Sequence, residues 1–442
     1  MAVYQDREAF IPYRRSDLIE LCVQDGQLAA ADVAIFRNFC EILSAYYHFN
    51  LHQKLESLKS NYDPFNPDAD TKYINQLTAD KKANMERQLV TVFANILTQA
   101  NYLHLNKRML RSALDKKSLI DLKTQIDFAD FDQLLCYYRG DRTQKITIKK
   151  LWKNVEKTIE VLERVVLLLK FKNTRYFEAK KIPIKKLNFK PGKIYVYFYK
   201  NIPKYDLELL FPNIKLSMTW KDRLLFGIPA IGAGIPLILK IIPELLAIAA
   251  VILFVFFGQS SLVKYIKEEQ VRNIMPMLVA LLSLIVGLGG FAFRQYNNYK
   301  NKKIKFQKDI TDTLFFRNLA NNASVFGALI DEAEEEECKE IILVYYHLIA
   351  SQTPLNPEQL DDRIEAWMEE KFGTKIDFDI NGPLRNLQAI RGKIVKDGEA
   401  EASMPEIPLL TYDNQGFCQV PSLDDAKTIV DYVWDNAFLY AK

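Results

Sequence analysis

One apolar stretch constrains this 442-residue chain more than any other feature. Residues 227–258 read GIPAIGAGIPLILKIIPELLAIAAVILFVFFG and carry only two charges, Lys240 and Glu244. A second apolar stretch, residues 274–293, reads IMPMLVALLSLIVGLGGFAF. About 20 apolar residues are needed to cross the ~30 Å hydrocarbon core of a bilayer. We therefore predict a transmembrane helical hairpin over 241–293, with spans at 241–257 and 274–293.

The segment just before the first predicted span, 224–239, contains two prolines and three glycines. These residues break the helical hydrogen-bond ladder, and in lipid each freed backbone group needs another partner. We therefore expect 224–240 to be an interfacial or re-entrant segment. The alternative is a third span through 224–239, which would put the two ends of the chain on opposite sides of the membrane.

The charges that flank the apolar region predict its orientation. Six basic residues precede the first acid after residue 293, and such a run marks the cytoplasmic side and attracts anionic lipid headgroups. These residues are Arg294, Lys300, Lys302, Lys303, Lys305 and Lys308. We therefore predict an integral membrane, multi-pass protein with both termini on the cytoplasmic side.

Lys240 and Glu244 lie one helical turn apart at the entrance to the first predicted span. In the simpler interpretation Lys240 extends to the headgroups and Glu244 pairs with it. In the alternative, the two residues form a polar site within the membrane, where ionisable groups are costly and often functional.

The rest of the chain predicts an α-rich α+β protein with soluble segments on both sides of the hairpin. Helical periodicity over 15–56 and 81–125 indicates an N-terminal helical domain, 1–145. A juxtamembrane α/β unit, 146–223, would contain a helix at 151–163 and strands at 164–172, 193–203 and 214–220. A basic exit helix and an acidic helical linker would fill 294–354, and helix, helix and hairpin order predicts a winged-helix-like domain over 355–442.

The net charge of +4 conceals an asymmetry along the chain. Residues 309–442 hold 11 basic and 26 acidic residues, a net of −15, whereas 1–220 have a net of +11. The two regions can dock on one another or face different partners. Because nucleic-acid modules need a positive footprint, the acidic winged-helix-like segment predicts protein contact and no nucleic-acid partner.

The sequence gives little indication of a catalytic, cofactor or metal site. No G-x-S-x-G, Walker A or G-x-G-x-x-G motif occurs, so no catalytic residue and no cofactor is predicted. His48 and His52 share one helix face and are weak candidates for a metal site, although no third ligand is evident. The Pro/Asn/Asp-rich segment 61–73 lacks the glycine and glutamate of a calcium loop and predicts a plain turn.

Five segments resemble a known family: AFIPYRRSDLIEL, YHFNLHQKLESLKSNYDPFNPD, YKNIPKYDLELLFPNIKLSMTWKDRLLFGIPA, NLANNASVFGALIDEAEEEECKEIIL and IDFDINGPLRNLQ. The chain is similar over nearly its whole length to a membrane family of unknown function from cyanobacteria, plastids and mitochondria, which includes transmembrane protein 143. The resemblance implies two spans in a plasma or thylakoid-type membrane, and no activity or site.

We expect a membrane-anchored, non-enzymatic interaction or assembly protein that presents its soluble domains on the inner face. Its predicted partners are a bilayer with anionic headgroups and an unknown protein partner or a second copy of the chain. The alternative is an oligomeric channel or transporter that uses 224–239 with Lys240 and Glu244, as broken helices do in transporters.

Overall fold

The structure, a computed structural model, describes residues 7–106, 110, 123–150, 153–217, 268–373, 375–394 and 404–440. These residues belong to two compact units, which we treat separately. The first unit comprises residues within 1–116, 128–207 and 317–442. The second comprises residues within 117–127 and 208–316.

A five-stranded antiparallel sheet organises the first unit. Its strands lie in the order β1-β3-β4-β5-β7, and every neighbouring pair is antiparallel. The strands are β1 (Leu103–His104), β3 (Phe131–Lys150), β4 (Lys153–Phe171), β5 (Ile194–Pro203) and β7 (Asn318–Asn321).

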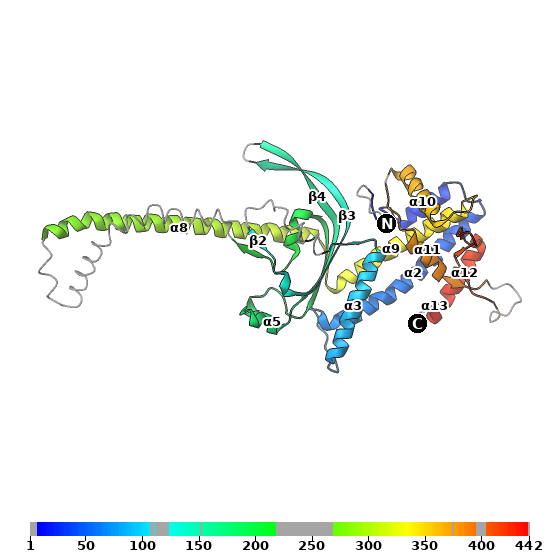
Figure 1. Cartoon of the computed structure of the whole chain (residues 1–442), viewed down its shortest axis with the longest axis horizontal. Coiled ribbons are helices and arrows are strands. Elements are labelled where there is room, and N and C mark those ends of the chain that lie inside the picture. The colour runs from blue at the N-terminus through cyan, green and yellow to red at the C-terminus, as the bar shows by residue number, and fades with distance from the viewer. Residues whose placement is uncertain are drawn as a thin grey trace. The chain divides into compact units, whose positions relative to one another are not determined.

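Strands β3 and β4 continue well past their neighbours as a two-stranded β-ribbon (Figure 1). The β4–β5 pairing ends at Val161, and β1 pairs only with Tyr137 and Tyr138 of β3. Residues 143–150 and 153–160 therefore pair only with each other among the strands that the structure describes. We call these residues the β-ribbon.

The helix predicted at 151–163 is wrong, because residues 153–163 form the first part of β4. Val155, Ile159 and Leu162 have helical spacing, but Val155, Ile159 and Val161 also fit the two-residue period of a strand. Both periods are present in the local sequence. The segment becomes a strand because it pairs with β3, and this pairing is a long-range interaction. The strands predicted at 164–172 and 193–203 are confirmed as the rest of β4 and as β5.

Three long helices, α2, α3 and α9, pack beside the sheet in the first unit, and the shorter α1 packs on α2 and α9. Helix α9 is central: its first part packs with α2, α3 and the sheet, and its second part with α1, α2 and the C-terminal helices. Figure 1 shows α3 and α9 beside the strands. The helices are α1 (Arg15–Gln24), α2 (Asp32–Tyr62), α3 (Ala79–Gln99) and α9 (Ala323–Ile349). Short helices are η1 (Asp63–Phe65), η2 (Phe128–Asp130), α5 (Thr174–Ala179), η3 (Ile184–Lys186) and η4 (Lys204–Leu210).

The C-terminal segment keeps the predicted helix order but not a separate core. Leu360, Leu387 and Ile429 share one hydrophobic cluster with Leu18 and Phe36 of the N-terminal helices. Of the two strands predicted for the hairpin, 416–422 contains β11, which pairs with β10. The other, 394–398, lies outside the described residues except for Ile394, which is in no strand. The elements are α10 (Pro357–Phe372), α11 (Asn381–Ala389), β8 (Arg391–Gly392), β9 (Ile407–Pro408), β10 (Thr411–Tyr412), β11 (Cys418–Gln419), α12 (Leu423–Asp435) and α13 (Ala437–Tyr440).

Gly392→Ala is expected to lower the free energy of unfolding by about 1–3 kcal/mol. A Cβ at this position would lie 2.6 Å from the backbone oxygen of Ile429 in α12, which has no room to move aside. Gly327→Ala, in α9, is the matched control, because a Cβ there meets nothing within 4 Å. The control should be stable to within about 1 kcal/mol of the parent or more stable. Urea unfolding of the two variants tests the difference, and equal midpoints would contradict it.

The second unit contains β2 (Lys123–Gln125), β6 (Lys215–Ser217) and most of α8 (Glu268–Arg317). Strands β2 and β6 pair antiparallel, so part of the strand predicted at 214–220 is confirmed. Around Leu209, the partly buried side chains of Ile214, Tyr299 and Ile310 form a small apolar cluster.

The predicted transmembrane hairpin is wrong. Over the described residues, the structure contains no helix with the length and apolar character that a membrane crossing requires. The predicted second span, 274–293, belongs to a 50-residue helix, α8, that continues through the basic residues to Arg317. Apolar composition alone does not fix where a helix ends. The same finding contradicts the predicted integral membrane localisation and the description as a multi-pass protein. The predicted first span, 241–257, and segment 224–240 lie outside the described residues.

Candidate functional site

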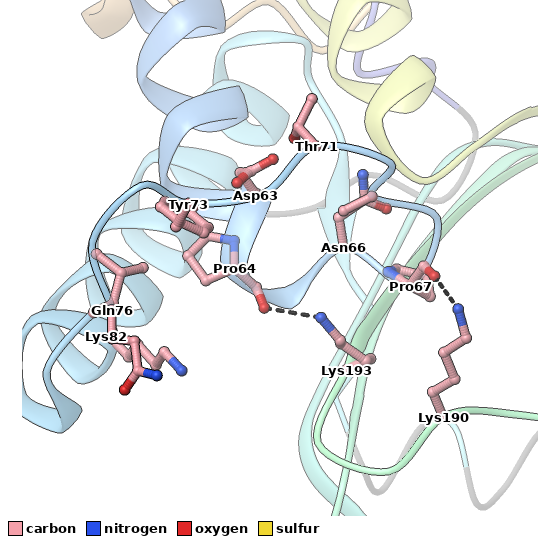
Figure 2. Close-up of a pocket in the computed structure, with 12 residues that line it drawn as sticks. Asp63, Pro64, Asn66, Pro67, Thr71, Tyr73, Gln76, Lys82, Lys190 and Lys193 are labelled. Carbon is pink, nitrogen blue, oxygen red and sulfur yellow. Dashed lines mark hydrogen bonds between the residues drawn. The ribbon is translucent and has the colours of Figure 1, made fainter.

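A polar cavity of about 530 Å³ lies in the first unit, between the loop after α2, the start of α3 and the turn before β5. Three lysines line it: Lys82, Lys190 and Lys193. Figure 2 shows Lys82 beside Gln76 on the α3 side, and Lys190 and Lys193 on the side of the sheet. Asp63 and Tyr73 come from the loop between them. We call this cavity the lysine pocket.

The sequence Lys190-Pro191-Gly192-Lys193 brings two of these lysines together. Gly192 has φ +75°, and the Lys193 N–H donates to the Lys190 carbonyl oxygen at 3.3 Å. Proline followed by a glycine with positive φ is typical of a type II turn. Lys190 and Lys193 are the first and last residues of this turn, so their side chains begin close together.

The same two ammonium groups hold the loop that forms the opposite wall. Lys190 Nζ donates to the Pro67 carbonyl oxygen, and Lys193 Nζ donates to the Pro64 carbonyl oxygen at 3.0 Å (Figure 2). Within the loop, the Asn66 side chain accepts from the Asp68 N–H at 3.0 Å, which is an Asx-type turn. The plain turn predicted for 61–73 is therefore a loop anchored from the sheet side by two lysines.

The lysine pocket is lined by more cationic than anionic side chains. Burial lowers the pKa of Lys193, and the positive charges of Lys190 and Lys82 lower it further, while Asp63 opposes the shift. Burial also raises the pKa of Tyr73 to about 12, with added contributions from its hydrogen bond to Asp63 and the charge of that carboxylate. Asp63 is the only acid among the described residues that line the pocket, so three cations face one anion.

A second cavity, of about 510 Å³, contains Glu337 of α9, Lys54 of α2 and Asn386 of α11. Burial raises the pKa of Glu337 and lowers the pKa of Lys54. Their polar atoms already have protein partners: Lys54 Nζ donates to Gln99 Oε1 at 2.9 Å, and Asn386 Nδ2 donates to Glu337 Oε2. This network joins four helices, and we interpret it as structural.

The acidic stretch 331–337 does not gather around one point. Glu332 lies 3.0 Å from an Arg139 nitrogen, Glu334 lies 3.4 Å from Arg15, and Glu335 accepts from the Arg15 N–H at 2.7 Å. Glu332 contacts strand β3 of the sheet, whereas Glu334 and Glu335 both contact Arg15 at the start of α1. Charge attraction between the basic front and the acidic tail therefore contributes to the first unit.

The weak metal candidates lie on α2. His48 Nδ1 is 2.8 Å from Glu334 Oε2, and the His48 and His52 ring centroids are 6.4 Å apart. Over the residues with described positions, no group of three or more His, Cys, Asp and Glu side chains is arranged to hold a metal ion.

The other predicted site residues fall in or near the second unit. Lys240 and Glu244 lie outside the described residues. The six basic residues predicted to contact anionic lipid, Arg294, Lys300, Lys302, Lys303, Lys305 and Lys308, are all in α8, and all but the half-buried Lys303 are exposed. Their contact with lipid headgroups stays a prediction.

Sequence reasoning missed the lysine pocket. The motif K-P-G-K at 190–193 is a readable turn signal that places two lysines at adjacent positions in space. The third lysine and the opposing loop come from more than a hundred residues earlier in the chain. Only the fold brings Lys82 and Asp63 to the turn.

Residues 162–324 match the family described as "Protein of unknown function (DUF3754)". The match covers less than half of the chain. It includes Lys190 and Lys193 but neither Lys82 nor the β-ribbon. No solved structure matches the chain.

Proposed function

We propose that this chain is a non-enzymatic interaction or assembly protein, and that the β-ribbon is the element that contacts its protein partner. The observation that supports the proposal most directly is the strand pairing of the ribbon. Its two outer edges have no strand neighbour within the described part of the chain, whereas β4 is paired on both sides from Val161 onward. Such edges can accept a further strand from another chain.

The composition of the β-ribbon suits an acidic partner surface. It contains five lysines and two glutamates, Glu156 and Glu160. Lysines in an edge strand oppose pairing between two copies of the same ribbon, because both copies carry the same net positive charge. The same lysines attract an acidic protein surface and speed the encounter with it. The lysines are Lys145, Lys149, Lys150, Lys153 and Lys157.

A binding role is also supported by the chemistry of the lysine pocket. The residues that line it include no Ser, Cys or His. A Ser–His or Cys–His pair, a common basis of covalent catalysis, is therefore not found among the described residues that line it. A pocket with fixed lysines and polar side chains suits the binding of a charged group better than its conversion.

Reversing two charges on the β-ribbon, with Lys145→Glu and Lys149→Glu together, is expected to weaken partner binding at least about tenfold. The matched control is Lys185→Glu with Lys186→Glu, which changes the net charge equally at two exposed lysines of η3. Quantitative co-purification from native extract measures both variants against the parent. Equal losses in the two variants would mean that net charge, and not the ribbon, governs association.

A further inference from the structure

The residues that line the lysine pocket carry more positive than negative charge. Lys82, Lys190 and Lys193 face a single carboxylate, that of Asp63, in a cavity of about 530 Å³. Burial and the two neighbouring ammonium groups hold the pKa of Lys193 below its ordinary value. An anion in the cavity would relieve this repulsion.

Donors remain available to such an anion. Each ammonium group has three N–H donors, and the bonds to Pro64 and Pro67 use one donor each on Lys193 and Lys190. Lys82 lies in the first turn of α3, where the helix dipole also favours negative charge, although Asp80 lies in the same turn and the Thr78 side chain accepts from the Lys81 N–H. The helix end alone is weak evidence, but here it adds to Lys82 itself and to the two lysines of a separate turn, Lys190 and Lys193.

The pocket also has groups for the uncharged part of a ligand. Thr71 and Gln76 offer a hydroxyl and an amide, and Tyr73, 46% exposed, offers an aromatic face. A surplus of two positive charges matches a dianion, and the cavity is larger than an inorganic ion needs.

We propose that the lysine pocket binds the phosphate group of a phosphate monoester. The ester can be a small soluble molecule or the headgroup of a lipid such as phosphatidic acid, since both present the same dianion. The lysine pocket and the β-ribbon share no residue. The test of phosphate binding and the test of the proposed partner contact can therefore give different outcomes.

The test is calorimetric titration of the full chain with inorganic phosphate, comparing Lys82→Ala with Lys81→Ala. Lys82 lines the pocket and Lys81, next to it on the exposed surface of α3, does not. We expect Lys82→Ala to weaken phosphate binding about tenfold and Lys81→Ala to leave it unchanged. Equal weakening by both variants, or no binding by the parent, would overturn the proposal. Circular dichroism of the variants checks that each is folded.

Two further arms distinguish the source of the phosphate and the site. In sedimentation with phosphatidylcholine vesicles, with and without phosphatidic acid, Lys82-dependent binding to the vesicles that contain phosphatidic acid is expected only if the phosphate monoester is a lipid headgroup. Glycerol phosphate in solution should compete with inorganic phosphate if the ester is soluble. In NMR titrations of lysine side chains, the pKa of Lys193 should rise when phosphate is added. A Lys193 pKa that does not respond would contradict binding in this pocket.

Discussion

Replacing Lys339 by methionine is expected to lower the free energy of unfolding by about 3–5 kcal/mol. Lys339 and Glu336 are almost fully buried, with 3% and 4% of their side chains exposed. Lys339 Nζ donates to Glu336 Oε1 at 2.6 Å and to the Ile11 carbonyl oxygen, while Glu336 Oε2 accepts from the Ile11 N–H at 3.1 Å. Removing the ammonium group leaves a buried carboxylate beside an unpaired carbonyl.

Double substitution separates this mechanism from a packing defect. In Lys339→Met combined with Glu336→Gln, the remaining side chain is neutral, so part of the lost stability should return. Urea unfolding of the two single variants and the double variant should give a coupling energy of about 1–3 kcal/mol. A Lys339→Met variant within about 0.5 kcal/mol of the parent would contradict the account.

Lowering the pH below about 6.5 is expected to destabilise the first unit through His347. This side chain is 2% exposed and lies between the rings of Tyr346 and Trp367, with centroids 5.1 and 5.2 Å away. Neither ring nitrogen has a hydrogen-bond partner within the described residues. Burial, and secondly the charge of Arg363, lower the pKa of His347 to about 3, against the opposing effect of Asp25.

The direction of the pH effect follows from proton uptake. The unfolded chain binds a proton at His347 below its ordinary pKa of 6.5, but the folded chain does not until about pH 3. This contribution to stability is therefore complete above pH 6.5 and is lost as the pH falls toward 3, by about 1.4 kcal/mol per pH unit. Burial raises the pKa of Asp361 to about 7 and acts in the opposite direction, since that contribution is lost as the pH rises from 3.8 toward 7.

Comparison with His347→Phe isolates the histidine. Both proteins keep Asp361 and the other titrating groups, so their contributions cancel in the difference between the two stabilities. Chemical unfolding between about pH 4 and pH 8 should show that the variant loses less stability than the parent on acidification. Parallel curves for the two proteins would contradict a buried neutral His347.

Local signals in the sequence predicted most of the helices of the first unit. Helix α10 begins with Asn356, Pro357 and Gln359, and the structure contains a capping box formed by Asn356 and Gln359. The helical periodicity of α2 and α3 also located those helices, although the prediction of helix as far as residue 125 was too long. After Gln99 the chain enters β1 and β2, whose pairing depends on distant strands.

The parts of the fold and of the site that were not predicted depend on contacts between residues far apart in the sequence. The four-residue spacing of Val155 and Ile159 fits both a helix and a strand, so only the register with β3 makes β4 a strand. The lysine pocket depends on the approach of the 63–76 loop to a turn far along the chain. Helix α9 illustrates the opposite case: acids close together on a helix point in different directions, so Glu332, Glu334 and Glu336 have different partners.

Native mass spectrometry of the full chain, purified gently from its source, tests the proposed function most directly. The account predicts a stoichiometric complex with a different protein. This complex should be lost in the Lys145→Glu/Lys149→Glu variant and retained in the Lys185→Glu/Lys186→Glu control. A chain that is found alone, or a closed oligomer of identical subunits that both variants still form, would contradict the account.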